Sequence, residues 1–515
     1  MKIKNIVIVG GGSSGWMTAS AIAHNLPEIN LTLIESPNIP NIGVGESTLG
    51  HINRFFRLLD LTDQDWMKEC SATYKNSIQF TNFHKIGTRF QYPFGGFIMP
   101  PDDEKYKFST EFDIPIFLDL QRLFPKEISC EDFVRFYNIN SLLAEYNKQT
   151  TQDVCGFDFF NHTAYHLDAD ALATFLKNRY NNRITHILDE VNNIECNELG
   201  ITKIISTNHT LTADLFIDCT GFKSLLIEKT LGVDWYQFPH LPNNKAVTAR
   251  IPYTTIEDQK NSIHNVTDCK ALSSGWLWDI PLWKRKGAGY VYSSEFLTKD
   301  QAEEEFRKET GWNDNVNHIS FRHGYHKKAF HKNVLAIGLS YGFIEPLEST
   351  GLLTTHENII KFIKLMQLHE GHINKLDKIL FNTSCEAQMS GLSDFVGVHY
   401  ALSRRDDTPY WNYVTNEIDQ SRYEYDLHVK EENIAQNLHE IFTFDRFDFR
   451  KEGMFCILMG NNYNPAERVQ FNYSTEQLKN INFKKNFIID SIKSRIDFVK
   501  NLPSSYDFLY NHIYK

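Results

Sequence analysis

The sequence lacks the features that mark membrane, secreted and nucleic-acid-binding proteins. It has no run of about eighteen apolar residues, so no membrane-spanning helix is expected. The first residues, Met1–Asn5, pass directly into an apolar segment without the small-residue cleavage site of a signal peptide. Positive charge is in deficit, since 53 Lys and Arg stand against 64 Asp and Glu, for a formal net charge of −11. We therefore expect no nucleic acid and no membrane as a partner.

Paired cysteines are also missing. The eight cysteines are scattered and include no Cys-x-x-Cys pair, which predicts reduced, mostly buried thiols in a cytoplasmic protein. A group of histidines lacks the H-x-x-x-H frame of a metal-binding helix: His318, His323, His326 and His331. We assign no metal. No repeat, low-complexity tract or Pro/Gly/Ser linker divides the chain.

The composition is that of a protein with a large core. The chain has 515 residues, of which 42% are hydrophobic and 13% aromatic, so disorder is excluded as the dominant state. At about 150 residues per domain the length suggests roughly three domains, and it equally suits one large α/β enzyme.

The first 35 residues have the pattern of a βαβ unit. Ile6–Val9 is a continuous β-branched run, which predicts a strand buried on both faces. A helical stretch from Gly15 to about Asn25 follows, and then a second strand, Leu31–Glu35. Strand, helix and strand in this order predict a parallel sheet.

The remaining chain divides by pattern. The section 60–150 is polar and aromatic and is hard to place as regular sheet, whereas sheet-like runs return at 184–218, 289–292 and 333–338. From about residue 354 the apolar residues follow a helical period, as in Ile359–Leu365. We predict an α/β body over 1–353, with a substrate-side insertion at about 60–150, and a mainly helical C-terminal subdomain over 354–515.

A glycine-rich turn lies between the first strand and its helix. Gly10 permits a tight turn, Gly12 lets the backbone approach a pyrophosphate, and Gly15 lets helix and strand pack closely. The helix N-terminus, with Ser13 and Ser14, would direct its N–H groups at the phosphates. Glu35 lies twenty residues past Gly15, where a carboxylate can hold ribose hydroxyls. Together these residues predict a dinucleotide site.

Two later strands bear on which dinucleotide binds. The segments 215–221 and 334–338 are apolar strands that end in glycine. If both end at the same site, they suit a long, extended FAD better than a nicotinamide cofactor. The alternative interpretation is that they are ordinary core strands.

The sequence resembles the tryptophan-halogenase family of flavin-dependent halogenases over roughly residues 5–465. The W-x-W-x-I-P and E-P-L-E-S-T-G motifs together are highly specific. The matching segments are Gly10–Trp16, Gly43–Thr48, Tyr74–Lys75, Tyr165–Ala169, Trp276–Pro281, Phe343–Gly351 and Arg405–Trp411.

This resemblance implies an FAD-binding Rossmann-like body of the flavin monooxygenase type. It also implies that a separate NAD(P)H-dependent flavin reductase supplies FADH2. FADH2 and oxygen then convert halide (chloride, bromide or iodide) into hypohalous acid, which travels inside the protein to a lysine beside a small aromatic substrate. A homodimer is compatible with the family pattern. The sequence contains no feature that identifies the preferred halide. We expect the enzyme to prefer bromide or iodide to chloride.

By the same resemblance, Lys75 and Glu348 are the catalytic residues. The uncharged neighbourhood of Lys75 would desolvate an ammonium, which would then either hydrogen-bond hypohalous acid or form a haloamine. Glu348 would stabilise the cationic ring intermediate and take its proton. Glu345 is the competing acid, for which we expect a role in capping or pairing. Ser349 is expected to hydrogen-bond in the substrate site.

The resemblance also assigns the flavin and halide residues. Thr350 and Gly351 would bind halide through a backbone anion nest. Trp276 and Trp278, at i and i+2 of an extended segment, would form a wall between flavin and substrate; without the family match they read as core residues. Further flavin contacts are expected at Val44, Glu46, Val191, Leu339 and Leu352.

The chain departs from tryptophan-specific members at the substrate side. Tyr92 replaces the histidine of their His-x-Phe, while Phe94 matches. Their clamp for the amino-acid backbone is not visible in 441–460, which is aromatic. We therefore expect an indole- or phenol-type substrate rather than free tryptophan. A flavin monooxygenase that hydroxylates its substrate directly and an inactive flavin-binding relative remain the alternatives.

Two further matches predict structural roles. His166 precedes an expected helix start, and we expect it to be structural. The charged group Arg405, Asp406 and Asp407 is expected to form a satisfied ion-pair cluster in the helical part of the chain.

Overall fold

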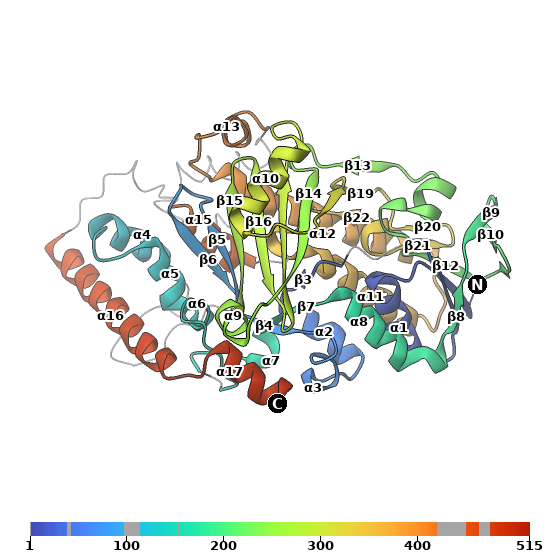
Figure 1. Cartoon of the computed structure of the whole chain (residues 1–515), viewed down its shortest axis with the longest axis horizontal. Coiled ribbons are helices and arrows are strands. Elements are labelled where there is room, and N and C mark those ends of the chain that lie inside the picture. The colour runs from blue at the N-terminus through green and yellow to red at the C-terminus, as the bar shows by residue number, and fades with distance from the viewer. Residues whose placement is uncertain (1, 39–42, 97–113, 153, 420–449, 463–473) are drawn as a thin grey trace.

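The computed structural model describes residues 2–38, 43–96, 114–152, 154–419, 450–462 and 474–515. Figure 1 shows three parts along the long axis of the molecule. A parallel sheet with its helices occupies one end, a large sheet the middle, and a group of helices from two distant segments of the chain the other end.

The parallel sheet contains the expected βαβ unit. Its strand order is β20-β21-β12-β1-β2-β8, and all neighbours are parallel except β20 and β21. The bounds are β1 Asn5–Val9, β2 Asn30–Glu35, β8 Thr185–Leu188, β12 Leu215–Asp218, β20 Phe330–His331 and β21 Val334–Ala336. The helix between β1 and β2 is α1, Ser13–Asn25. The predicted late strands therefore lie in the same sheet as the first strand.

The large sheet is mostly antiparallel, with the order β18-β14-β17-β16-β15-β5-β6; only β15 and β5 are parallel. Its strands are β5 Ser77–Thr81, β6 Arg89–Pro93, β14 Lys245–Pro252, β15 Val266–Leu272, β16 Gly275–Pro281, β17 Arg285–Tyr292 and β18 Asn317–Ser320. β5 and β6 come from the section 60–150, which was hard to place as sheet. Both strands are only five residues long and mix polar with apolar residues, so their pattern is weak.

A three-stranded sheet, β3-β7-β4, joins segments that are distant in the sequence. β3 is Glu46–Ser47, β4 is Thr73–Lys75 and β7 is Ala164–Leu167. The pairing places Ser47 and Thr73 on either side of His166. Two further small sheets are β11-β10-β9 and β13-β19-β22, with bounds β9 Val191–Asn197, β10 Gly200–Ser206, β11 Thr210–Leu211, β13 Trp235–Gln237, β19 Gly324–His326 and β22 Gly342–Phe343.

The described C-terminal portion is helical, as predicted. Its helices are α11 Thr350–Leu368, α12 Lys375–Ala401, α13 Pro409–Asn416, α15 Arg450–Gly460, α16 Thr475–Lys500 and α17 Ser505–Leu509, with a final π-helix, η7, at Tyr510–Tyr514. The expected division at 353/354 lies inside α11, which continues without interruption across it. No helix of the described residues is long and apolar enough to cross a membrane.

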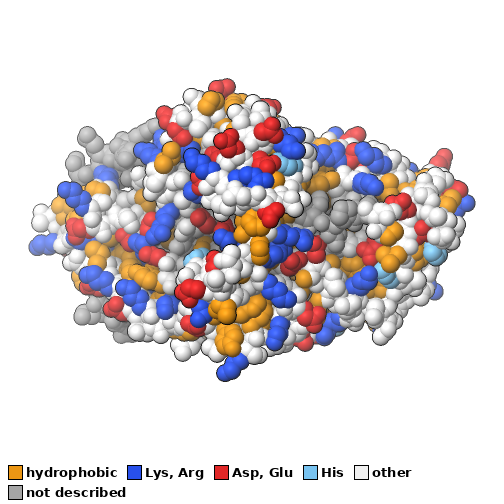
Figure 2. Space-filling model, viewed as in Figure 1, with side chains coloured by type: hydrophobic (Ala, Val, Ile, Leu, Met, Phe, Trp, Pro, Cys, Tyr) orange, Lys and Arg blue, Asp and Glu red, His pale blue; other side chains and the backbone are white. Residues whose placement is uncertain are grey.

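The earlier helices cover the sheets and fill the connections between them. They are α2 Ile52–Leu58, α3 Asp63–Trp66, α4 Ile114–Leu123, α5 Cys130–Tyr137, α6 Ile139–Glu145, α7 Phe159–His162, α8 Ala169–Tyr180, α9 Ile256–Ser262 and α10 Lys299–Thr310. Short 3-10 or π turns are η1 Asn181–Arg183, η2 Gly221–Lys223, η3 Leu225–Thr230, η4 Gly338–Ser340 and η5 Pro346–Glu348. One large apolar cluster joins both main sheets, and a smaller one lies under α10. On the face in Figure 2, Lys and Arg side chains are interspersed with Asp and Glu.

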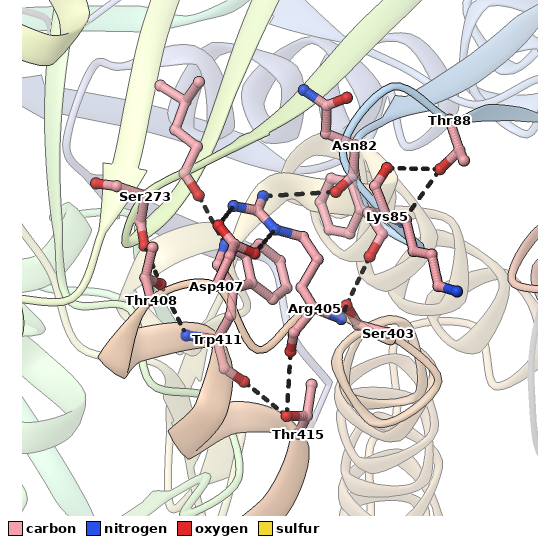
Figure 3. Close-up of polar contacts among 12 residues, drawn as sticks. Asn82, Lys85, Thr88, Ser273, Ser403, Arg405, Asp407, Thr408, Trp411 and Thr415 are labelled. Atoms are coloured by element: carbon pink, nitrogen blue, oxygen red, sulfur yellow. Dashed lines mark hydrogen bonds and ion pairs between the residues drawn. The ribbon is translucent and has the colours of Figure 1, made fainter.

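The chain after α12 is held by an ion pair (Figure 3). Both Nε and Nη2 of Arg405 donate to Asp407 at 2.8 Å, and Arg405 Cζ lies 4.5 Å from the centroid of the Trp411 ring. Arg405 is buried and Asp407 is one-third exposed. The expected ion pair is therefore confirmed for these two residues, whereas Asp406 is exposed and forms no ion pair with the described residues.

Two hydroxyls on either side of this pair fasten the segment to the large sheet (Figure 3). Ser403 Oγ donates to the carbonyl of Phe83, beyond the end of β5, at 2.6 Å. Thr408 caps α13 and donates to the carbonyl of Ser273, between β15 and β16, at 2.7 Å. The C-terminal end of α12 is thus fixed against two loops of the sheet.

Candidate active site

Lys75 ends β4 with its side chain fully buried. Nζ donates to the carbonyl of Thr48 at 3.1 Å and to Ser349 Oγ at 2.8 Å. Loss of hydration on burial lowers the pKa of Lys75 to about 7, although Cys269 and Glu348 oppose the shift. In its ammonium form the group has one N–H donor beyond the two that bond Thr48 and Ser349.

Ser349 links Lys75 to a line of buried hydroxyls. Its Oγ accepts from Lys75 and donates to Ser47 Oγ at 3.0 Å. Ser47 Oγ lies 2.8 Å from Thr267 Oγ1. Because a serine hydroxyl has one hydrogen and Ser47 already accepts from Ser349, Ser47 donates to Thr267.

His166 continues the same line. Its Nε2 lies 2.8 Å from Thr267 Oγ1 and its Nδ1 lies 3.2 Å from Thr73 Oγ1, which donates to the carbonyl of Pro281 at 2.6 Å. Because the single hydroxyl hydrogen of Thr73 is donated to the Pro281 carbonyl, Thr73 can only accept from His166. Nδ1 of His166 is therefore the donor, and Nε2 is the acceptor. Burial holds the pKa of His166 well below its usual value, which keeps the ring neutral. These contacts fit the structural role expected of His166.

Glu348 is the last residue of η5 and is fully buried. Its Oε1 lies 2.7 Å from Nε2 of His399, a residue of α12 that is also fully buried. Burial raises the pKa of Glu348, which His399 and Lys75 oppose. Neither oxygen makes a well-directed hydrogen bond with the described residues. No signal in the sequence pointed to His399, because it belongs to no motif and comes from a distant helix.

Glu345 is held in a different way from Glu348. Its Oε2 accepts three hydrogen bonds, from Trp276 Nε1 at 3.0 Å, Asn243 Nδ2 at 2.7 Å and the Tyr400 hydroxyl at 2.8 Å. Its side chain is buried, and burial raises its pKa. This set of contacts agrees with the pairing role expected for Glu345 and distinguishes it from Glu348.

Trp276 and Trp278 lie on one face of β16, as expected. Both pack in the large apolar cluster, whereas Leu277 between them packs in the smaller one. Trp278 is opposite Gly289 of β17, and a Cβ at Gly289 would overlap the indole ring. Only glycine leaves room for this indole against the neighbouring strand. Whether the pair separates flavin from substrate stays a prediction.

The predicted substrate residues lie beside Lys75. The centroid of the Phe94 ring is 4.8 Å from Lys75 Nζ. The Tyr92 ring lies edge-on to Phe94 at 6.0 Å and 6.2 Å from the ring of Phe395 on α12. Phe94 thus lies next to the lysine, and Tyr92 lies next to Phe94. Residues 441–449 of the expected clamp region lie outside the described residues, and 454–459 are buried in α15.

The glycine turn has the geometry that a dinucleotide requires. Gly10 has φ +110°, and a Cβ there would overlap the carbonyl of Cys219 at the end of β12. α1 begins at Ser13 with Gly12 as N-cap and no side-chain cap, so its first N–H groups are available to an anion. Gly338, at the end of β21, lies against Ser14. Both late strands thus end at the glycine turn, which favours the first of the two interpretations of these strands.

The other expected flavin residues surround this turn in part. The Glu35 carboxylate lies against Gly11 and contacts His186 Nε2 at 2.6 Å and Lys177 Nζ at 3.4 Å. Val44 is buried and its carbonyl lies against Gly287 of β17. The remaining positions are Glu46 in β3, Val191 at the start of β9, Leu339 in η4 and Leu352 in α11.

The expected halide residues form the start of α11. Ser349 is the N-cap, with φ +58°, and makes no side-chain cap. Thr350 Oγ1 is buried and has no hydrogen-bond partner among the described residues. A helix N-terminus without a cap, next to an unsatisfied hydroxyl, fits a small anion. The described residues contain no group of three or more His, Cys, Asp or Glu side chains arranged to hold a metal ion.

Comparison with known proteins agrees with this geometry. The tryptophan halogenase family matches residues 5–475. The 7-chloro-L-tryptophan 6-halogenase KtzR of Kutzneria sp. (strain 744) is 35% identical over 429 residues, covering 79% of this chain and 81% of KtzR.

Solved structures extend the agreement to the whole chain. The apo structure of VirX1 has a TM-score of 0.90 at 39% identity, covering 100% of this chain and 99% of that chain. BrvH, a flavin-dependent halogenase from Brevundimonas sp. BAL3, has a TM-score of 0.84 at 26% identity, covering 99% of both chains. The fold and the relatives identify a flavin-dependent halogenase with the expected α/β, Rossmann-like fold. The chain belongs to the tryptophan halogenase family.

Proposed function

We propose that this enzyme halogenates small electron-rich aromatics of the indole or phenol type by passing hypohalous acid to Lys75. The observation that carries the proposal is the buried amine of Lys75, which has a partner on either side, Thr48 and Ser349, and an aromatic ring above it. Such a group can direct its remaining N–H at a neutral oxidant that is poorly held by charged sites.

Lys75 would orient the oxidant. Its bonds to the Thr48 carbonyl and to Ser349 fix the position of Nζ, so the remaining donor has a defined direction. A hydrogen bond from this donor to hypohalous acid makes the halogen more electrophilic. The neutral amine, which is accessible because the pKa is about 7, could instead form a haloamine.

Glu348 would act on the substrate. Attack of an aromatic ring on the halogen gives a cationic ring that must lose a proton. Oε2 of Glu348 makes no bond with the described residues, while Oε1 lies against His399. The unengaged oxygen is thus the one that we assign to this proton.

The flavin would be FAD, used as FADH2, and a separate NAD(P)H-dependent flavin reductase would supply it. The glycine turn, the uncapped start of α1 and Glu35 suit its pyrophosphate and ribose. When bound, reduced FAD supplies the electrons that convert oxygen and halide into hypohalous acid. Thr350 and Gly351 would hold the halide at the N-terminus of α11.

The substrate proposal differs from the named activity of the relatives. KtzR is named for a chlorinated tryptophan. In this chain Tyr92 stands where tryptophan-specific members have histidine, and its ring approaches Phe94 and Phe395. Aromatic rings bind flat substrates with little demand for an amino-acid backbone. We therefore propose indoles and phenols without that backbone as the preferred class.

The experiment supplies the protein with FAD, a flavin reductase, NADH, halide and a panel of indoles, phenols and pyrroles. Mass spectrometry should show products with one hydrogen replaced by halogen. A product heavier by one oxygen would identify a flavin monooxygenase instead. Bound flavin without any product would identify an inactive relative.

A further inference from the structure

His399 is a fully buried side chain that lies against the carboxylate of Glu348. The Nε2–Oε1 distance is 2.7 Å, and neither side chain is exposed. The ring of His399 lies between Phe80, at 4.7 Å, and Phe395, at 5.3 Å between centroids. Two aromatic rings thus separate this pair from water.

The backbone fixes which nitrogen of His399 carries a hydrogen. Nδ1 lies 2.9 Å from the carbonyl of Phe395, one turn earlier in α12. A carbonyl only accepts hydrogen bonds, so Nδ1 must be the N–H donor. Nε2 is then the nitrogen whose protonation can change, and it is the atom that faces Glu348.

Glu348 Oε1 and His399 Nε2 approach closely enough to share a proton, although neither atom makes a well-directed hydrogen bond with the described residues in this conformation. A carboxylate oxygen facing a bare imidazole nitrogen at 2.7 Å would oppose two lone pairs in a buried site. The pair therefore holds one proton, either as carboxylic acid and imidazole or as carboxylate and imidazolium. The other titratable groups that face the pair are Lys75 from β4, Cys269 from β15 and Glu345 from the same loop.

We propose that Glu348 and His399 work as one acid–base pair that shares this proton, with His399 as a positioning residue that acts through Glu348. The proposal rests on the halogenation proposed above. In the transfer step a bond forms between a ring carbon and the halogen while the oxygen–halogen bond breaks. The departing oxygen takes the electron pair and the proton of the pair, and leaves as water. The ring carbon then returns its proton to the pair, so the enzyme ends as it began.

A carboxylate alone serves this sequence poorly. It would have to be protonated to assist the departing oxygen and ionised a moment later to accept from the ring. A pair that holds one proton between its two members can do both. Oε2, which is not the oxygen in contact with His399, is the atom through which the pair would act on the substrate.

The test compares His399→Gln and His399→Leu with the wild-type full-length enzyme. Each is supplied with FAD, a flavin reductase, NADH, bromide and indole, in the presence or absence of a scavenger of hypohalous acid. Oxidant captured by the scavenger should stay within about twofold of wild type. Halogenated indole should fall by about 10²-fold for Leu and at least about tenfold for Gln, the range for loss of acid–base assistance.

The pH dependence distinguishes a proton shared by the two residues from a role of His399 in merely holding Glu348 in place. The amide of Gln can still hold Glu348 in place, but it cannot store a proton. The ratio of halogenated indole to captured oxidant should therefore fall more steeply with rising pH in His399→Gln than in wild type. A Gln variant with the wild-type ratio and pH dependence overturns the proposal. His240→Gln is the matched control, because His240 is also buried and its Nε2 lies 3.2 Å from a carbonyl of the same helix, at Ser393.

A measurement without substitution of His399 covers the case in which its variants do not fold. Ring-15N histidine spectra of wild type and Glu348→Gln should differ at one histidine, which keeps its Nδ1 hydrogen and loses the shared proton on Nε2. Identical spectra would overturn the proposal. If the wild-type enzyme gives neither halogenated product nor captured oxidant, the halogenation proposal fails, and these spectra still decide whether the pair shares a proton.

Discussion

The indole N–H of Trp276 donates a 3.0 Å hydrogen bond to Glu345 Oε2. The bond joins the two most specific motifs of the sequence, since Trp276 belongs to W-x-W-x-I-P and Glu345 to E-P-L-E-S-T-G. It also explains why two glutamates three residues apart have different surroundings. Glu345 is hydrogen-bonded to Trp276 of the large sheet, whereas Glu348 faces Lys75 and His399.

Lys75→Ala should abolish halogenated product while flavin binding and oxygen consumption with the reductase remain. The reason is that Lys75 acts after hypohalous acid has formed. Flavin binding, oxygen uptake and product are measured in parallel. Lys270→Ala is the control, because Lys270 forms only a partly exposed ion pair with Glu309. Retention of most halogenation in Lys75→Ala would contradict the assignment.

Glu348→Gln should lower halogenation by about 10² to 10⁴, the range for loss of a positioned acid–base group. It preserves shape and should leave the melting temperature nearly unchanged. Glu345→Gln is the contrasting variant, and we expect it to cost about 1–3 kcal/mol of stability because it disturbs a buried acceptor of three bonds. Turnover and thermal unfolding are measured for both. The reverse pattern would mean that Glu345 is the catalytic acid.

Halide affinity should weaken as pH rises through neutrality. Burial raises the pKa of Glu46 to about 7, and the charge of Asp170 adds to the shift. A Cβ on Gly351 would lie 3.8 Å from Glu46 Oε2, so the carboxyl borders the proposed halide position. Below the pKa it is neutral; above it the negative charge repels an anion. The halide KM should therefore rise between about pH 6 and pH 8, and Glu46→Gln should remove most of that rise. An unchanged slope in the variant would exclude Glu46 as the cause.

Plain indole should be a better substrate than free tryptophan, with halogen entering at C3, the most nucleophilic carbon. A buried zwitterion needs a partner for each charge, since an unpaired buried ion costs several kcal/mol. Competition at equal concentration gives the ratio of kcat/KM directly. A tenfold preference for tryptophan, with halogen at one position of the benzo ring, would show that a clamp for the amino-acid backbone exists.

Much of the fold could be predicted because its signals are local. The βαβ unit, Glu35 at the end of β2 and the glycine-ended strands β12 and β21 are each visible in a few consecutive residues. The lysine and the two glutamates could be named from their motifs. In contrast, β5 is stabilised by pairing with β15, far away in the sequence, and β6 joins the sheet only through β5, so their own pattern is weak.

The contacts of the site were beyond sequence reasoning for the same reason. Ser47 and Thr267 are 220 positions apart and meet only because β3 and β15 fold beside β7. His399 reaches Glu348 from a helix whose end is fixed by the hydrogen bonds of Ser403 and Thr408 to two loops of the large sheet. One such contact needs the whole tertiary structure, and no spacing within the chain encodes it.

The line of hydroxyls behind Lys75 ends at the carbonyl of Pro281, which has no hydrogen to pass on. A relay that stops at such an acceptor conducts no proton to solvent. Lys75 must therefore exchange its hydrogens through the substrate side, and when a ligand covers that side the amine keeps the charge with which it was closed in. If the enzyme with its ligand bound is transferred quickly to a new pH, the rate of the first turnover should therefore still be the rate at the original pH.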